Sequence, residues 1–78
     1  MNRPNEKMKT ARERFEEAGW HFEYDNEVGI EYSFPFFTYI KFFKESREYY
    51  VIWNGDYAYV DMKLHKLITY QLEELGWL

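Results

Sequence analysis

The spacing of apolar side chains near the start of the chain is that of a helix. Apolar residues recur there every three or four positions, which places them on one face of a helix. They are Met8, Ala11, Phe15 and Ala18. Asn5 can cap the helix through its side-chain oxygen, and Gly19 can end it because glycine adopts the left-handed conformation without strain. The pattern predicts a first helix over residues 5–18, supported by the i,i+4 pairs Lys9 with Glu13 and Arg12 with Glu16.

A second helix is predicted at the other end of the chain, over residues 62–75, with Asp61 as its N-cap. Its expected inner stripe is Leu64, Leu67, Ile68, Leu72 and Leu75. A competing interpretation starts this helix near Asp56. Both helices end in Gly-Trp, so we expect two Schellman endings, in which Trp20 folds back onto Phe15 and Trp77 onto Leu72.

After the first helix the apolar period changes to two, which predicts strands. Trp20, Phe22 and Tyr24 alternate with polar residues, and a loop over residues 25–27 places Val28, Ile30 and Tyr32 on the same face. A connection over residues 35–37 then aligns Tyr32 with Ile40 and Ile30 with Phe42. Pro35 suits this corner because it lacks a backbone donor.

Residues 36–53 form an aromatic-rich hairpin if residues 44–47 are a four-residue loop. That loop pairs Phe43 with Glu48 and Ile40 with Val51, and cross-strand partners share a face. The expected core face is Thr38, Ile40, Phe42, Tyr49, Val51 and Trp53. The other face is Phe37, Tyr39, Lys41, Phe43, Glu48, Tyr50 and Ile52.

Asn54-Gly55 is a strong signal for a two-residue turn, which would add a short fifth strand. The pairs expected across it are Trp53 with Asp56, Val51 with Ala58, and Tyr49 with Val60. Residues 1–78 are therefore predicted to be a single small α+β domain. We expect a two-layer sandwich, an antiparallel meander of four or five strands with the N- and C-terminal helices packed on one face.

The registers together predict what the uncovered sheet face presents. One expected row is His21, Glu31, Lys41, Tyr50 and Tyr59, and the next is Ser33, Tyr39, Ile52 and Tyr57. Glu31 and Lys41 are expected to form a cross-strand ion pair. Exposed tyrosines are typical of interface cores, so we hypothesise a partner-binding surface of Tyr39, Lys41, Tyr50, Ile52, Tyr57 and Tyr59. The alternative is that tyrosine is simply a good strand former on a half-solvated face.

Composition and charge narrow the classes of function. The chain has no cysteine, hence no disulfide, and no apolar run of membrane-spanning length, which together predict a cytoplasmic protein. The net charge is −4, which disfavours non-specific binding to nucleic acid. One acidic stretch carries no lysine or arginine between its members, and it is a second hypothetical binding surface: Glu16, Glu17, Glu23, Asp25, Glu27 and Glu31. A solvated surface that keeps the protein soluble is the plainer interpretation.

Candidate chemistry is sparse. His21, Glu23 and Asp25 alternate on a strand, a spacing too common to predict a metal site by itself. His65 lies at the edge of the helix stripe and is interpreted as a packing or hydrogen-bonding residue. The sequence contains no nucleophile elbow and no glycine-rich phosphate loop, so neither a cofactor nor an enzymatic activity is expected.

The predicted layout resembles that of double-stranded-RNA-binding domains, which also place a sheet between two terminal helices. Those domains carry a lysine cluster at the start of the last helix, whereas here the segment reads Asp61-Met62-Lys63-Leu64-His65-Lys66. The small size, acidity and aromatic content also look like those of short bacteriophage accessory proteins. Three hypotheses follow. They are a homodimeric or partner-binding protein-interaction module that uses the tyrosine-rich sheet face, a phage-type inhibitor that presents its acidic surface to a basic groove of a host protein, and a single-strand nucleic-acid binder that stacks bases on tyrosines.

Overall fold

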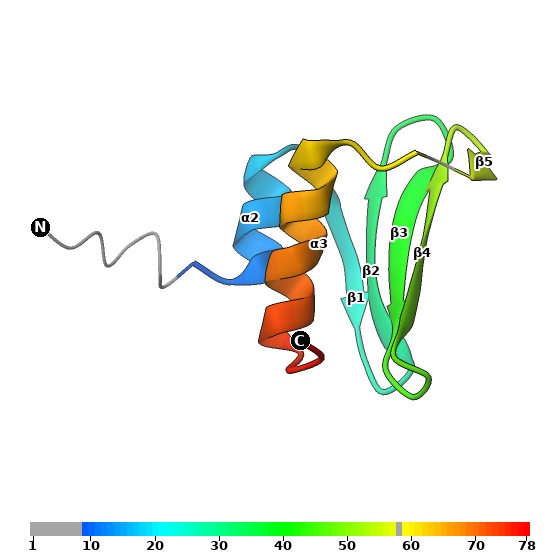
Figure 1. Cartoon of the computed structure of the whole chain (residues 1–78). Coiled ribbons are helices and arrows are strands. Elements are labelled where there is room, and N and C mark those ends of the chain that lie inside the picture. Colours follow the sequence, from blue (N-terminus) through cyan, green and yellow to red (C-terminus); the bar gives the residue numbers. More distant parts are fainter. Residues whose placement is uncertain (1–8, 58) are drawn as a thin grey trace, which may run out of the picture.

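The computed structural model describes residues 9–57 and 59–78 and shows an antiparallel sheet with two helices on one face (Figure 1). The elements are α2 (Ala11–Glu17), β1 (His21–Asp25), β2 (Gly29–Phe34), β3 (Thr38–Phe43), β4 (Glu48–Trp53), β5 (Asp56–Tyr57) and α3 (Met62–Glu74). The strands follow the order β1-β2-β3-β4-β5 as a simple meander. The predicted α+β sandwich is therefore confirmed. Neither helix of the described chain is long and apolar enough to cross a membrane.

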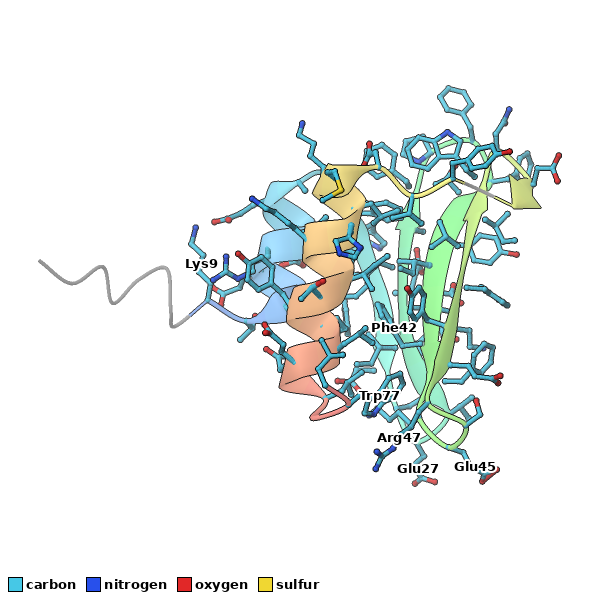
Figure 2. The ribbon with its side chains drawn as sticks, in the orientation of Figure 1. Lys9, Glu27, Phe42, Glu45, Arg47 and Trp77 are labelled. Atoms are coloured by element: carbon cyan, nitrogen blue, oxygen red, sulfur yellow. The ribbon has the colours of Figure 1, made fainter. Side chains whose placement is uncertain are left out.

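The core lies between the helix pair and one face of the sheet. Its central contact stacks the Phe15 ring on the Tyr32 ring, with centroids 4.0 Å apart and planes 9° from parallel. The buried apolar side chains around this contact are Trp20, Ile30, Ile40, Phe42, Val51, Leu64 and Ile68. Figure 2 shows Phe42 pointing from the sheet toward the helices. Both helices lie on this side of the sheet, so within residues 9–57 and 59–78 no helix or strand covers the opposite face (Figure 1).

The two helices run antiparallel, and contacts between polar groups join them at two successive turns of α2. The Ala11 amide at the start of α2 donates to Glu74 Oε2 near the end of α3, at 2.9 Å. One turn further along, the Arg14 guanidinium lies 3.9 Å from the centroid of the Tyr70 ring. Glu74 therefore places an anion at the positive end of the α2 dipole, where it is stabilising.

Both helix ends have the predicted Schellman geometry. Gly19 takes φ +98° and the Trp20 amide donates to the Phe15 carbonyl at 2.9 Å. At the other end the Trp77 amide donates to the Leu72 carbonyl, also at 2.9 Å. Each bond satisfies a carbonyl that the helix leaves unpaired and turns a tryptophan back toward the core.

The start of the first helix differs from the prediction. Thr10 is extended, with ψ 161°, and is the N-cap of α2, so a continuous helix over residues 5–18 is wrong. Thr10 and Glu13 form a capping box that satisfies two amides at once, which explains why the helix begins there. The Arg12–Glu16 pair forms at 3.3 Å, whereas Lys9 pairs with Glu17 at 2.8 Å. Asn5 and Met8 lie outside the described residues.

The second helix begins where it was predicted. The Leu64 amide donates to Asp61 Oδ1 at 2.8 Å, so Asp61 is the N-cap. The alternative start near Asp56 is wrong because that residue belongs to β5. In the expected stripe Leu64 and Ile68 are buried, while Leu67, Leu72 and Leu75 are partly buried against the core.

The central registers are as predicted. The four-residue loop pairs Phe43 with Glu48 and Ile40 with Val51, and the Pro35 corner pairs Tyr32 with Ile40. Asn54 and Gly55 both have positive φ, and the turn pairs Trp53 with Asp56 and Ile52 with Tyr57. β5 ends at Tyr57, so Val60 does not pair with Tyr49. Ala58 lies outside the described residues.

The register of β1 contains a bulge that the alternation did not predict. Phe22 pairs with Tyr32 and Tyr24 pairs with Glu31, so Glu23 is an extra residue in the strand. The extra residue inverts the faces, because Phe22 packs against the core while Tyr24 lies on the uncovered face with Glu31. The expectation that Tyr24 shares the core face with Trp20 and Phe22 is therefore wrong.

Several other residues of the expected apolar faces are not buried, Ala18 among them. Val28 lies in the β1–β2 turn and is exposed. Tyr49 and Trp53 point to the helix side from β4, but they stay 43% and 48% exposed because the helices do not cover this edge of the sheet fully. Gln71, by contrast, is fully buried, and its Oε1 accepts a hydrogen bond of 2.6 Å from the Tyr32 hydroxyl.

Candidate functional site

The sheet face turned away from the helices carries a contiguous aromatic cluster. We call this surface the open face, and its central side chains are Tyr24, Glu31, Ser33, Tyr39, Lys41, Phe43, Tyr50 and Ile52. Glu31, Lys41 and Tyr50 lie in one cross-strand row, as predicted. Ser33, Tyr39, Ile52 and Tyr57 are aligned in the next row, also as predicted.

The rings of the open face hold each other in place. Tyr50 packs edge-to-face against Tyr39 at 6.0 Å and against Phe43 at 5.4 Å. Lys41 Nζ lies over two rings, 4.9 Å from the Phe43 centroid and 5.6 Å from the Tyr24 centroid. Such contacts fix rotamers before any partner arrives, so little side-chain entropy remains to be lost on binding.

The charged pair at the centre of the open face is not the predicted ion pair. Glu31 and Lys41 are cross-strand neighbours in the described chain, yet their charged atoms do not come within ion-pair distance. The Tyr24 hydroxyl donates to Glu31 Oε1 at 3.2 Å instead. The bulge in β1 is the cause, since it brings Tyr24 opposite Glu31.

Proton affinities on the open face reflect these contacts. The pKa of Lys41 is raised, chiefly by its hydrogen-bonding interaction with Tyr24 and despite some desolvation, so its positive form is favoured. The pKa of Tyr50 is also raised, chiefly by burial and then by the neighbouring Tyr39. The centre of the open face therefore combines neutral aromatic rings with the cation Lys41, and Glu31 and Glu23 lie on the same face.

Some predicted members of the surface lie elsewhere. His21 pairs with Ser33, so it is not in the row of Glu31. Tyr59 follows β5 and is fully exposed, outside the sheet. Tyr57 contributes its backbone to β5. Tyr39, Lys41, Tyr50 and Ile52 are the hypothesised residues that the fold brings together as a side-chain surface.

The acidic residues do not gather into one surface, and most have partners within the chain. Glu16 and Glu17 pair with Arg12 and Lys9 on the helix. Asp25 Oδ1 lies 2.7 Å from Lys44 Nζ. On the open face Glu23 accepts from the Ser33 hydroxyl and Glu31 from Tyr24. Glu27 lies in the β1–β2 turn at the lower end of the molecule (Figure 2).

The histidines are exposed and poorly placed for chemistry. His21 Nε2 lies 3.9 Å from Glu23 Oε2. The bulge interrupts the regular alternation of β1, which was the reason to expect Asp25 on the same face as His21 and Glu23. Among residues 9–57 and 59–78 no three histidine, aspartate or glutamate side chains are grouped so that they could hold a metal ion. The His65 side chain is exposed, and only its carbonyl accepts a bond, from the Thr69 hydroxyl.

Tyr24 is the open-face residue that sequence reasoning missed. Both Phe22 and Tyr24 are aromatic, so the alternation fits a regular strand equally well and gives no sign of the extra residue. The available signal was that phenylalanine is fully buried more often than tyrosine, which favours Phe22 over Tyr24 for the core. No family model, curated protein or solved structure matches the chain.

Proposed function

We propose that this chain is a non-enzymatic protein-interaction module that forms a homodimer through the open face. The observation that carries the proposal is the aromatic cluster held in fixed contacts on a sheet face that the helices leave uncovered. Tyr50 remains 36% exposed within this cluster, so its ring still has area to bury. Tyrosine is enriched at interfaces because it buries a large area with only two side-chain torsions to restrict.

The charges of the open face favour a second copy of the chain as the partner. In a two-fold interface residue i meets residue j and residue j meets residue i. Lys41 and Glu31 have opposite charges and form no ion pair with each other in the described chain, so each can meet its counterpart on the other copy. Two intermolecular Lys41–Glu31 contacts would set the orientation of the dimer, while the rings supply the buried area.

Sedimentation velocity tests the proposal with a double substitution, Tyr39→Ala and Tyr50→Ala. We expect the native chain to sediment as a dimer and the variant as a monomer with an unchanged circular dichroism spectrum. The matched control is Tyr49→Ala with Tyr70→Ala, because these tyrosines are similarly exposed but lie on the helix side. A native chain that is monomeric at all concentrations, or a loss of self-association in the control alone, would contradict the proposal.

The other two functions suggested by the sequence have less support. An inhibitor with an acidic surface would need free carboxylates, but Glu16, Glu17 and Asp25 pair with cations of their own chain. A single-strand nucleic-acid binder would need flat, accessible rings for stacking. The Tyr39 and Tyr50 rings instead meet at 70°, and the net charge of −4 repels phosphates.

A further inference from the structure

A second surface lies on the helix side of the sheet, at the end where α3 begins. A groove of about 590 Å³ runs there between the last turn of α2, the first turns of α3 and the ends of β2 and β4. It is separate from the open face, because its sheet residues Phe34 and Trp53 point to the helix side. No part of the proposed dimer contact is used by this groove.

The floor of the groove is aromatic. The centroid of the Trp20 ring lies 4.9 Å from that of Phe34 and 6.4 Å from that of Trp53. The Phe34 and Trp53 rings stack with their centroids 6.2 Å apart. Trp20 is buried, whereas Trp53 keeps about half of its surface exposed. The exposed part of Trp53 is apolar area on the wall of a concave site, which is where apolar ligand groups bind.

The rim of the groove carries two exposed lysines, Lys63 and Lys66. Its acids are already engaged, since Glu17 pairs with Lys9 and Asp61 caps α3 through the Leu64 amide. Lys63 and Lys66 are both exposed, and neither has an ion pair or hydrogen bond within the described part of the chain. Three residues apart on α3, they face the same side of the helix. This positive rim contrasts with the net charge of −4 of the whole chain.

The turn that joins β2 to β3 follows the groove residue Phe34 directly and carries two exposed phenylalanines. Phe36 and Phe37 both have positive φ, 64° and 54°, and their side chains are 78% and 83% exposed. The Gly55 amide donates to the Phe37 carbonyl at 3.0 Å, which ties this turn to the turn that follows Trp53. Bulky residues rarely adopt this conformation, and it persists only where surrounding contacts impose it, most often at functional sites.

We infer that the groove binds an acidic amphipathic segment of a partner protein. Apolar side chains of the segment pack on Trp53 and Phe34 and against the rings of the Phe36-Phe37 turn, while its carboxylates meet Lys63 and Lys66. Charge complementarity selects this occupant, because Lys63 and Lys66 on the rim are exposed cations. A nucleic acid is disfavoured since its many phosphates would face an acidic protein across only a short positive rim.

Fluorescence anisotropy with a synthetic probe tests the inference. The probe is a fluorescein-labelled peptide of about 14 residues, with leucine at every third or fourth position and glutamate elsewhere. The counterpart has lysine in place of glutamate. We expect Lys63→Glu with Lys66→Glu to weaken binding of the acidic peptide by roughly tenfold or more, and to strengthen binding of the basic one.

The matched control is Lys44→Glu with Arg47→Glu, which changes the net charge equally in the β3–β4 turn at the far end of the molecule (Figure 2). It should leave the affinity for the acidic peptide nearly unchanged. Trp53→Ala should weaken binding of the acidic peptide, but the protein should still bind the acidic peptide more tightly than the basic one. Phe36→Asn with Phe37→Gly should also weaken binding of the acidic peptide, because two exposed rings of the adjoining turn are removed.

Three results would overturn the inference. They are no binding of the acidic peptide, equal losses in the rim variant and its control, and displacement of the bound peptide by a single-stranded oligonucleotide at low salt. Binding that persists in the Tyr39→Ala, Tyr50→Ala variant is expected, because that variant alters the open face alone. The inference about the groove can therefore be contradicted while the proposed dimer stands, and the proposed dimer can be contradicted while the inference about the groove stands.

Discussion

The two faces of the sheet are built from similar aromatic strands, yet they use their rings in opposite ways. On the covered face Tyr32 and Phe42 are fully buried and pack against Phe15 of α2 in the core. On the open face Tyr39, Phe43 and Tyr50 also contact each other, but they remain partly exposed. Neighbouring residues of one strand thus point to opposite faces and differ in burial, as Phe42 and Phe43 do.

The difference shows why aromatic content by itself does not predict a core. Burial on the covered face depends on the helix layer, which supplies the other half of each contact. The rings of the open face pack only against each other and the sheet, so part of their apolar area remains exposed and can still be buried. We therefore expect stability to be sensitive to the covered face and association to the open face.

The largest effect is expected from Phe42→Ala. The side chain is 0% exposed and its removal leaves a cavity, so the free energy of unfolding should fall by about 3 to 5 kcal/mol. Phe43→Ala is the matched control, because the next residue along the strand lies on the open face. It should cost only about 1 kcal/mol, since Phe43 is partly exposed already. Urea denaturation measures both, and equal losses would remove the distinction between the faces.

The next effect concerns a buried hydrogen bond between the sheet and α3, from Tyr32 to Gln71. Tyr32→Phe leaves Gln71 Oε1 buried without its donor and should cost about 1 to 3 kcal/mol. Gln71→Leu should cost a similar amount by orphaning the Tyr32 hydroxyl. The double variant should cost less than the sum, because both polar groups are then gone. Strict additivity in thermal or urea unfolding would mean that the hydrogen bond contributes nothing.

A smaller effect should appear at alkaline pH. Burial, and then the nearby Glu74 and Asp25, raise the pKa of Tyr32 above its ordinary value of 10.0. The unfolded chain releases this proton near pH 10 while the folded chain retains it, so the stabilisation is full below pH 10 and is lost as the pH rises further. Tyr32→Phe should show a shallower loss of stability above pH 10 than the native chain. Parallel alkaline curves in equilibrium denaturation would contradict this assignment.

The smallest effect is expected at aromatic rings that belong to neither face. Phe36→Asn with Phe37→Gly replaces two strained, exposed residues by types that tolerate positive φ. The melting temperature should stay the same or rise, by the equivalent of up to about 1 kcal/mol. A clear fall in melting temperature would show that these rings stabilise the fold, contrary to their exposure.

Much of the fold could be predicted from local rules. The hairpin register followed from one loop length, and the Schellman endings followed from Gly-Trp at both helix ends. Thr10 and Glu13 also have the spacing of a capping box, although the helix was predicted to be capped by Asn5. These features depend on residues that are close in sequence, which is why the pattern reports them.

The rest depended on contacts between distant elements. Glu74 reaches the Ala11 amide only because the helices pack antiparallel, and the buried Gln71 accepts from the Tyr32 hydroxyl only because α3 packs on the sheet. For the candidate site, the rows containing Tyr39, Lys41 and Tyr50 were correct, but the bulge at Glu23 moved Tyr24 into the site. Such a bulge adds a residue without changing the polar and apolar pattern, so no periodicity can reveal it.

The most direct test of the central claim is sedimentation equilibrium of a charge-reversal series on the open face. The native chain should have twice the monomer mass of 9.8 kDa. Glu31→Lys and Lys41→Glu, each alone, should shift it toward the monomer because like charges then meet across the two-fold contact. The double reversal should restore the dimer. A native monomer, or a double variant that dissociates more than either single one, would contradict the assignment of the open face as the dimer surface.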